Sequence, residues 1–291
     1  MAMTINTNAM SLNAQRNATN NAMSLATTMA RLSSGLRVNS SKDDAAGLAI
    51  ADRMNTQVRG MNVAIRNAND GISLAQTAEG GLAGLNDMLQ RMRELAIQAS
   101  NSTNTTGVSG DLAKLNNEYV QLRDEVSRTI QATTFNGMPV LNVDPASAND
   151  FVFQVGANDT SANRITVAAV NVSLSGNAAM DAVLLGGATA VLATGAAAAN
   201  TANIAALDSA ISAVNDRRAT LGAVQSRFEQ TIANLRIGVE NQAAARGRIM
   251  DADFAAETAN LSRSQILQQA GTAMIAQANQ QPQNVMRLLQ S

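Results

Sequence analysis

The sequence predicts a mainly α-helical protein built from long antiparallel coiled-coil helices, with a small β-hairpin element. The three prolines are Pro139, Pro145 and Pro282, so residues 1–138 and 146–281 contain no obligatory helix breaker. Apolar residues recur at alternating spacings of three and four in both stretches, which is the helical period. Of all residues 46% are hydrophobic but only 2% are aromatic, so we expect narrow seams between helices rather than a thick core.

The first long helix is expected over residues 44–99. Its apolar stripe steps by four and three, slips once in phase and then resumes, which indicates a coiled coil with one stammer. The stripe consists of Met54, Val58, Met61, Ile65, Ala68, Ile72, Ala75, Leu82, Leu85, Leu89, Met92, Ala96 and Ala99. Ser40 and Ser41 precede Asp43 and Asp44, an arrangement that suits an N-terminal cap with acids in the first turn.

A second helix is expected to fold back on the first. Residues 101–110 (NSTNTTGVSG) carry only turn and cap chemistry, and a new spacing of three and four follows them. The second stripe consists of Leu112, Leu115, Tyr119, Leu122, Val126 and Thr129. The sequence therefore predicts an antiparallel pair.

The period changes after Phe135. The motif FNGMPVLN carries a turn signal, while residues 151–155 (FVFQV) and 164–167 (RITV) favour strands that the loop GANDTSAN joins into a hairpin. Residues 166–207 carry one charge, Asp181, and are rich in Ala, Gly and Asn. We expect this segment to pack only lightly.

A strong helical pattern returns at about Asn203. The stripe consists of Leu207, Ile211, Val214, Arg218, Leu221, Gln225, Phe228, Ile232, Leu235, Val239 and Gln242. Its polar members are expected to lower stability while fixing the register of the helix pairing. Residues 246–254 (RGRIMDADF) are expected to interrupt the helix before a further amphipathic stretch at 255–278.

Both ends of the chain carry narrow apolar stripes beside amide-rich faces. The stripes consist of Ala18, Ala22, Leu25, Met29, Leu32 and Leu36 at the amino end, and of Leu261, Leu267, Ala270, Met274 and Ala278 at the carboxyl end. Neither end can bury its stripe alone in water. We therefore expect the ends to pair with each other and with neighbouring chains.

The composition argues against catalysis and against a metal or cofactor site. The chain has no His and no Cys, so the usual zinc ligands, thiolate nucleophiles and the general base best suited to neutral pH are missing. Asp43 with Asp44, and Asp251 with Asp253, are interpreted as helix caps because no further ligand cluster accompanies them. We expect no catalytic residue, no cofactor and no metal.

Neither nucleic acid nor a membrane is an expected partner. The 21 Lys and Arg residues are scattered among 22 Asp and Glu residues, so no basic face stands out. Residues 264–286 are uncharged near the carboxyl end, but hydrocarbon would penalise their many Gln and Asn side chains. Residues 1–30 carry one charge, Arg16, and lack the continuous apolar region of a cleaved secretory signal. Export would need another route.

Dense collinear motifs occur at both ends of the chain. At the amino end they are LSSGLRVNSSKDDAAGLAIADRM from Leu32, LQRMRELAIQASN from Leu89 and FNGMPVL from Phe135. At the carboxyl end they are LGAVQSRFEQTIANL from Leu221 and SRSQILQQAGTAMIAQANQQPQNVMRLL from Ser262, and the loop QVGAND lies between. These motifs resemble those of bacterial flagellin, the subunit of the flagellar filament, over residues 1–158 and 205–291.

The resemblance implies two concentric core domains, each built from both ends of the chain. Residues 1–43 and 250–291 would form the inner core domain, whose terminal helices pair in the filament. Residues 44–135 and 203–249 would form the outer core domain. Residues 136–202 would form the β-hairpin and a short variable region where longer members carry large exposed domains, so a thin and comparatively smooth filament is implied.

The same resemblance implies partners and a location. The chain would polymerise with itself into an extracellular helical filament for swimming motility, after passing unfolded through the flagellar type III apparatus without a cleaved signal peptide. An export chaperone, the filament cap and the junction proteins are further implied partners. The residues implied in polymerisation and chaperone binding are Leu25, Met29, Leu32, Leu267, Ala270, Met274, Val285, Leu288 and Leu289.

Innate immune receptors of the host are also implied partners. The residues that match the Toll-like receptor epitope of flagellins are Arg91, Leu95 and Glu118, and residues 285–289 match the tail sensed by inflammasome receptors. Arg91 and Leu95 are four apart and share a helix face, while Glu118 is expected on the antiparallel neighbour. An Arg beside a Leu anchor is common hot-spot chemistry. Spacing alone favours a solvated helix face, and it is the motif match that favours receptor contact.

Two other classes of protein stay open. A hook-filament junction protein has related ends, but such proteins match these motifs far less closely. Some flagellins carry a protease insert in the middle and would be enzymes. No HExxH-type metal motif occurs in this chain, and its middle is almost free of charge, so a structural role is preferred over an enzymatic one.

Overall fold

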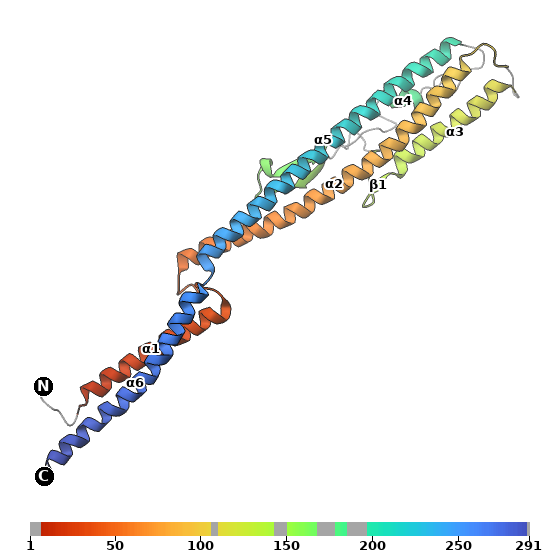
Figure 1. Cartoon of the computed structure of the whole chain (residues 1–291). Helices are drawn as coiled ribbons and strands as arrows, with labels where there is room; N and C mark the ends of the chain where they lie inside the picture. Colours follow the sequence, from red (N-terminus) through yellow and green to blue (C-terminus); the bar gives the residue numbers. More distant parts are fainter. Residues whose placement is uncertain (1–6, 106–109, 143–149, 168–177, 185–196, 290–291) are drawn as a thin grey trace. The chain divides into compact units, whose positions relative to one another are not determined.

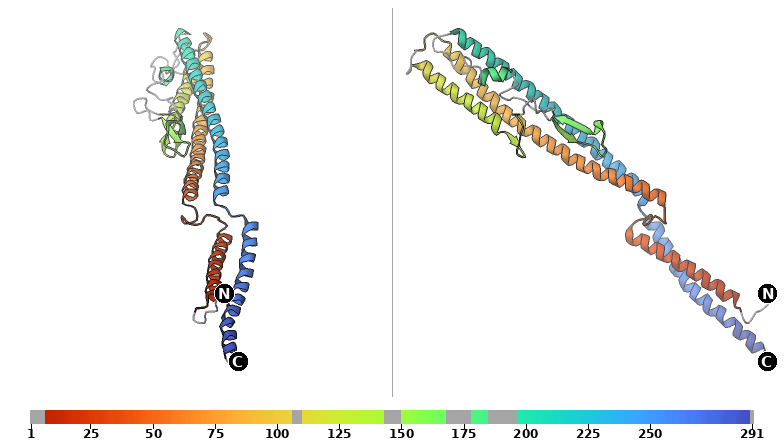
Figure 2. Two further views of the ribbon diagram at one scale, coloured as in Figure 1. Left: turned by 90° about the vertical axis from the view of Figure 1, so that its left-hand side faces the viewer. Right: turned by 180° about the vertical axis from the view of Figure 1, so that it is seen from behind.

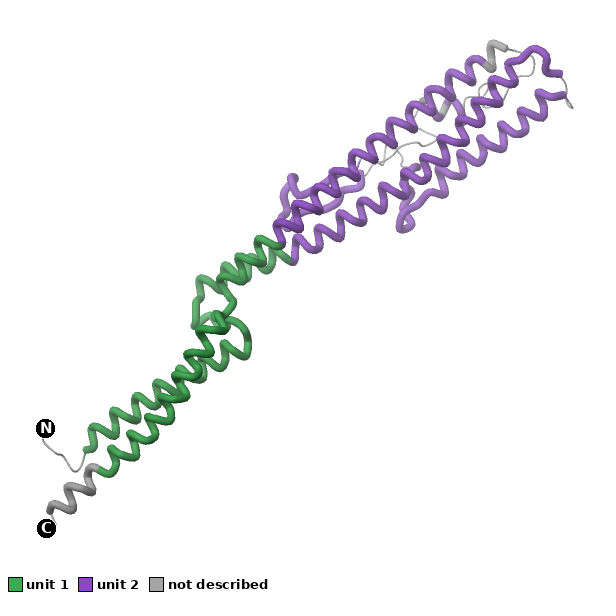
Figure 3. Tube along the Cα trace, in the orientation of Figure 1, with its two compact units in different colours: residues 1–58, 240–291 green, residues 59–239 purple. Residues whose placement is uncertain are grey.

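The computed structural model describes residues 7–105, 110–142, 150–167, 178–184 and 197–289 (Figure 1). The chain forms two compact units, each with its own internal packing (Figure 3). We call residues 1–58 with 240–291 unit 1, and residues 59–239 unit 2.

Unit 1 contains a pair of terminal helices, α1 (Ala9–Ser34) and α6 (Phe254–Leu289), which run antiparallel side by side (Figure 1). The side chain of Asn8 caps α1 by accepting a hydrogen bond from the backbone N–H of Ser11. Gly35 ends α1 in the left-handed conformation at φ +70°, which glycine adopts without strain. The carboxylate of Asp253 accepts from the N–H groups at the start of α6, so its predicted role as a cap is confirmed.

The two links that leave the terminal helices are joined to each other by backbone bonds. Leu36 and Asp251 form an isolated antiparallel β-bridge, and the N–H of Arg37 donates to the carbonyl oxygen of Met250 at 2.6 Å. We call residues 35–38 and 250–252 the clasp. A small buried cluster lies beside it and consists of Val38, Ala51 and Met250.

Unit 2 contains most of α2 (Ala45–Ala99) and α5 (Ala197–Met250), together with α3 (Asp111–Ala132) (Figure 2). The α3 helix runs back along α2, as predicted. One apolar core joins the three helices, and its largest fully buried members are Tyr119, Phe228, Leu82, Leu85, Leu89, Met92, Leu95, Ile130, Leu141, Met180, Leu207 and Leu221. Eight of these twelve residues belong to the predicted stripes, whereas Leu95 and Ile130 lie outside them and Leu141 and Met180 are not on the three helices.

Two antiparallel hairpins pack on unit 2. The strands β3 (Phe151–Gln154) and β4 (Arg164–Val167) form the hairpin predicted from the sequence, and the short 3₁₀ helix η2 (Ser161–Asn163) precedes β4. The ring of Phe153 on β3 meets the ring of Phe228 edge-on, with centroids 5.6 Å apart. This contact fixes the hairpin against α5.

The second hairpin is formed by β1 (Thr134–Phe135) and β2 (Met138–Pro139). Asn136 and Gly137 lie between the strands with φ of 51° and 78°. Positive φ at both central residues is what a type I′ turn requires, and Asn-Gly is its preferred sequence. The turn predicted at FNGMPVLN is therefore a hairpin.

Several predicted boundaries were wrong. The α5 helix begins at Ala197 rather than near Asn203, and it continues through Arg246 to Met250. The interruption before α6 is confined to residues 251–253. The positive charge of Arg248 lies in the last turn of α5 and stabilises it there, because the carboxyl end of a helix dipole is negative.

The variable region also packs more firmly than expected. The short helix α4 (Ala178–Leu184) buries Met180 and Val183 completely, and both belong to the core of unit 2. Light packing was expected because small residues dominate this stretch, but three of its few large side chains lie together on one helix. The remaining predicted residues between 168 and 196 lie outside the described part of the chain.

The predicted capping role of Asp43 and Asp44 at the start of α2 is confirmed for Asp44 alone. The side chain of Asp44 itself accepts from the backbone N–H of Gly47 at 2.8 Å and caps the helix. Asp43 instead accepts from Ser40 in the turn before it, and these hydrogen bonds lower the pKa of the Asp43 carboxyl.

The compact units do not coincide with the predicted inner and outer domains. The units divide between residues 58 and 59 and between residues 239 and 240, whereas the predicted domains divide at 43 and 249. The assignment of chain segments to filament layers stays a prediction. No helix in the described ranges is long and apolar enough to cross a membrane.

Candidate assembly surface on the terminal helices

The seam between α1 and α6 is lined by polar side chains. The buried residues of α1 are Ser11 and Thr28, and those contributed by α6 include Glu257 and Ser264. Large apolar side chains, which fill the core of unit 2, are missing from this set. Buried polar groups must be hydrogen-bonded to be tolerated, and most of this seam meets that condition.

Hydrogen bonds cross the seam along much of its length. The order of the contacts along the two helices is antiparallel, so the start of α1 meets the end of α6. The contacts are Asn8 Nδ2 to the carbonyl oxygen of Ala278 at 2.7 Å, Ser11 Oγ to Asn279 Oδ1 at 2.8 Å, Asn21 Nδ2 to the carbonyl oxygen of Ser264 at 2.8 Å, and Arg31 Nη1 to Glu257 Oε1 at 3.1 Å.

The apolar side chains of the same two helices are exposed instead. Eight of them have between 52% and 66% of their surface accessible, and they are Met10, Leu12, Met23, Met29, Phe254, Ile266, Leu267 and Met274. Leu25, Leu32, Leu261 and Ile275 are half-buried on these helices, so the pair covers only part of its apolar side chains, whereas an amphipathic helix usually turns its apolar face to its partner. The helix pair therefore presents a large unburied apolar area.

Part of this apolar area forms a groove of about 530 Å³ between α1 and α6. Its apolar walls come from Met10, Ala14, Ala18, Leu267, Ala270 and Met274. Amide side chains of α1 line its rim. The groove is wide enough for apolar side chains of another protein segment.

A separate polar cluster lies on unit 2. A guanidinium nitrogen of Arg91 on α2 lies 2.8 Å from a carboxylate oxygen of Glu118 on α3, and another lies 2.9 Å from Glu94. These hydrogen bonds raise the pKa of Arg91, and the bond to Glu118 contributes most. Leu95, one helical turn further along α2, is only 1% exposed and belongs to the core. The surface feature here is thus the ion pair of Arg91 and Glu118.

Comparison with known proteins identifies the family. Residues 5–144 match the model for the bacterial flagellin N-terminal helical region, and residues 204–289 match the model for the C-terminal helical region. A flagellin of Halalkalibacterium halodurans is 43% identical over 99% of this chain and all of its own length, and a flagellin of Bacillus subtilis is 42% identical over the same shares. The chain belongs to the bacterial flagellin family.

Membership of the flagellin family makes this chain a structural subunit of the flagellar filament, which lies outside the cell. A flagellin of Xenorhabdus nematophila is 43% identical over 99% of this chain and its whole length. Among solved structures, the crystal structure of a Bacillus cereus flagellin matches with a TM-score of 0.47 and 31% identity, covering 58% of this chain and 88% of its own.

The structure divides the residues predicted for flagellin polymerisation into four groups. Leu267, Ala270 and Met274 line the groove, Met29 is exposed elsewhere on α1, and Leu25 and Leu32 are half-buried. Val285, Leu288 and Leu289 lie on the last turns of α6, but their side chains are outside the described residues. The predicted pairing of the two ends is confirmed, although the pairing leaves much of the apolar stripe uncovered.

The polar members of the α5 stripe make contacts of different kinds. Gln225 donates to a carboxylate oxygen of Glu79 at 2.9 Å, and Gln242 donates to the side chain of Gln57. Nε of Arg218 is buried without a hydrogen-bond partner in the described part of the chain. The role of these residues in fixing register stays a prediction.

Sequence analysis missed the polar seam of the terminal helices. A helical pattern predicts that apolar residues are buried and polar ones exposed, so it could not predict the burial of Ser11, Thr28 and Ser264. One signal was available, because Glu257 is the only acidic residue in α6 and Arg31 is one of two charged residues in α1.

Proposed function

We propose that this flagellin polymerises through the exposed apolar faces of α1 and α6, which neighbouring copies cover in the filament. The observation that carries the proposal is the set of eight large apolar side chains that the helix pair leaves exposed beside its hydrogen-bonded seam. Monomeric soluble proteins rarely leave large apolar patches uncovered. Covering one Leu or Met side chain fully is worth about 1.5–3 kcal/mol, and a filament repeats the gain at every subunit.

The groove offers the most direct test of this proposal. Replacing Leu267 and Met274 by Ser removes apolar area from its wall without touching the seam. The critical concentration for seeded assembly is expected to rise by about tenfold or more, since 1.4 kcal/mol corresponds to a factor of ten. Electron microscopy and turbidity measure this, and circular dichroism checks that the helices are kept.

A matched control lies on unit 2. Val152 on β3 is 57% exposed, as is Met274, and Val152→Ser is expected to leave assembly unchanged. An unaltered critical concentration in the groove variant would overturn the proposal. Deletion of residues 255–291 is expected to abolish filaments altogether, and a wild-type chain that stays monomeric after seeding would favour the hook-filament junction alternative.

We also propose that an export chaperone covers the carboxyl part of this apolar surface before assembly. The proposal is supported by the exposure of Leu267 and Met274 in the free subunit, because exposed apolar side chains promote aggregation. Stoichiometric binding of the chaperone is expected to weaken in the Leu267→Ser/Met274→Ser variant, as measured by calorimetry. We also propose that the flagellar apparatus exports the subunit without cleaving its amino end. The intact mass of the secreted subunit tests this proposal. Contacts with the filament cap and junction proteins are proposed through the same terminal helices.

We further propose that a host Toll-like receptor recognises the surface around Arg91 and Glu118. Both side chains are about half exposed and joined by an ion pair, so a receptor can meet them together, while the buried Leu95 supports the helix from within. Arg91→Ala is expected to lower the response of a receptor reporter by about tenfold, a typical loss at an Arg hot spot. Arg128→Ala, which removes another exposed ion pair of unit 2, is the control, and equal responses of both variants would refute the assignment.

A further inference from the structure

We propose that the ion pair of Arg31 and Glu257 fixes the register of α1 against α6 and so determines which groove the helix pair presents. The inference rests on the proposed assembly role, but its test reads helix alignment directly and does not depend on filament growth.

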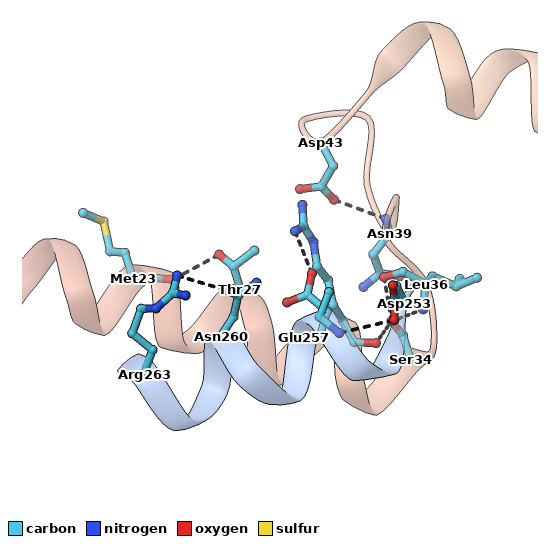
Figure 4. A network of polar contacts seen from close by, with 12 residues as sticks. Met23, Thr27, Ser34, Leu36, Asn39, Asp43, Asp253, Glu257, Asn260 and Arg263 are labelled. Atoms are coloured by element: carbon cyan, nitrogen blue, oxygen red, sulfur yellow. Dashed lines mark hydrogen bonds and ion pairs between the residues drawn. The ribbon is translucent and has the colours of Figure 1, made fainter. Parts of the chain in front are cut away.

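The pair lies where the two helices begin and end. Arg31 is in the last turn of α1 and Glu257 is in the first turn of α6, so each charge also favours the dipole of its own helix. Figure 4 shows Glu257 with Asp253 at the start of α6, beside the link that carries Asn39 and Asp43. The side chain of Glu257 is 10% exposed and that of Arg31 is 32% exposed.

The rest of the seam discriminates poorly between registers. Asn8 and Asn21 donate to backbone carbonyl oxygens of α6, and every residue of a helix carries such an oxygen. Ser11 pairs with the amide of Asn279, but α6 carries many other amides. Small side chains offer little shape to oppose sliding, so these contacts can re-form after a slip.

The ion pair cannot re-form in the same way. Arg16 and Arg31 are the only charged residues of α1, and Glu257 is the only acid of α6. A slip of one heptad in one direction would leave Glu257 facing Ser24, with no cation opposite, and a slip in the other direction would carry it past the end of α1 into the link. Removing one partner of a buried ion pair is strongly destabilising because the other charge is left buried and unpaired. A single polar contact in a helix seam is known to specify register for this reason.

The register determines the shape of the groove. Ala18 and Gly271 both line it, and a Cβ atom built on Gly271 would lie 3.7 Å from the Cβ of Ala18. A slip of one heptad would bring Ser264 or Ala278 to that place and move Leu267 and Met274 past Met10. Only one alignment therefore gives the apolar walls described above.

Cysteine pairs can read the alignment, since the chain has no cysteine of its own. The distance of 3.7 Å falls within the Cβ–Cβ range of a disulfide, about 3.5–4.5 Å. The pair A18C/G271C reports the observed register, and A18C/A278C reports a slip of one heptad. Both are oxidised in the full-length chain, soluble and assembled, and non-reducing electrophoresis separates intrachain from interchain products.

Each cysteine pair is combined with R31E, with E257R and with R31E/E257R. The ratio of observed-register to slipped disulfide is expected to fall by about tenfold or more in each single reversal and to recover in the double reversal. R16E makes the same charge change at an exposed site of α1 and is expected to leave the ratio unchanged. E257Q gives a milder test in which the helices stay paired.

The outcomes separate cleanly. If single reversals only unpair the helices, recovery of A18C/G271C closure in the double reversal still supports the proposal, and failure to recover overturns it. Single reversals that close the observed-register disulfide as well as the parent also overturn it. Failure of the groove variant to alter assembly would refute the proposed function alone, because the disulfide ratio is measured without reference to filament growth.

Discussion

Replacing Gly71 by Ala is predicted to destabilise unit 2, although the same change elsewhere on the long helices should stabilise it. Gly71 lies on α2 directly beneath the ring of Phe228, which is fully buried. A Cβ atom at this position would lie 2.5 Å from Cζ of Phe228 and 2.9 Å from Cε2. Real Cβ contacts are longer, so the ring must move against Phe153, which meets it edge-on.

The magnitude follows from two opposing terms. An overpacked core costs roughly 1–3 kcal/mol, while Gly to Ala in a helix gains about 1 kcal/mol. The free energy of unfolding is therefore expected to fall by about 1 kcal/mol. For a unit of this size, a change of that order lowers the midpoint of thermal unfolding by roughly 2–4 °C.

Thermal unfolding of the soluble full-length subunit, followed by circular dichroism, measures this. Gly80→Ala and Gly222→Ala are matched controls, because a Cβ atom at either position has no neighbour within 4 Å. Both controls are expected to raise the midpoint. If Gly71→Ala raised it as much as Gly80→Ala, the packing of Phe228 against α2 would be refuted. Adding Phe228→Leu to Gly71→Ala should make the two changes less than additive.

Three further predictions concern separate features. Leu95→Ala is expected to lower the free energy of unfolding by about 2–5 kcal/mol in urea denaturation, because a fully buried side chain is truncated, and an unchanged midpoint would contradict its burial. Burial raises the pKa of Tyr119, the single tyrosine of the chain, from 10.0 to about 12. Between pH 10 and 12 the phenol ionises in the unfolded chain but not in the folded one, so the free energy of unfolding should fall as the pH rises through this range. Ultraviolet titration should show no phenolate near pH 10 in the folded chain. Asp44→Ala removes the cap that accepts from Gly47 and should cost about 1 kcal/mol, whereas Asp44→Ser should restore most of the loss.

The long helices and the β3–β4 hairpin could be predicted from the sequence because their periods are clear. Leu82, Leu85 and Leu89 repeat at helical spacing, and all three are fully buried. The spacing of apolar residues does not predict the buried face where Ala dominates, because Ala fits both buried and exposed positions. That is why the first residues of α5 and the buried side of α4 escaped prediction.

The candidate site was harder to predict, because periodicity shows which residues share a face but not which face is covered. Met274 and Leu267 share a face of α6 and remain exposed, whereas Ser264, one turn before Leu267, is buried. Leu95, which the resemblance matches to a receptor epitope, is 1% exposed in the core, and its role in recognition stays a prediction. Tertiary packing decides both cases, and spacing within one helix carries no information about it.

The clasp has a consequence for how far this chain can vary. Its links are joined through main-chain groups, with Arg37 donating to Met250 and Ala252 donating to Gly35 at 3.0 Å. Main-chain groups are supplied by nearly every amino acid, so these backbone bonds survive most exchanges of side chains and are vulnerable chiefly to residues that alter the backbone. The positions constrained by their side chains are Val38 and Met250, which are buried, and Arg37, which donates to the carbonyl oxygen of Ile249. Proline at position 37 would remove a donor, and a β-branched residue at position 35 would oppose the positive φ. Because backbone bonds hold the clasp together, the exposed side chains around it can change without breaking these bonds.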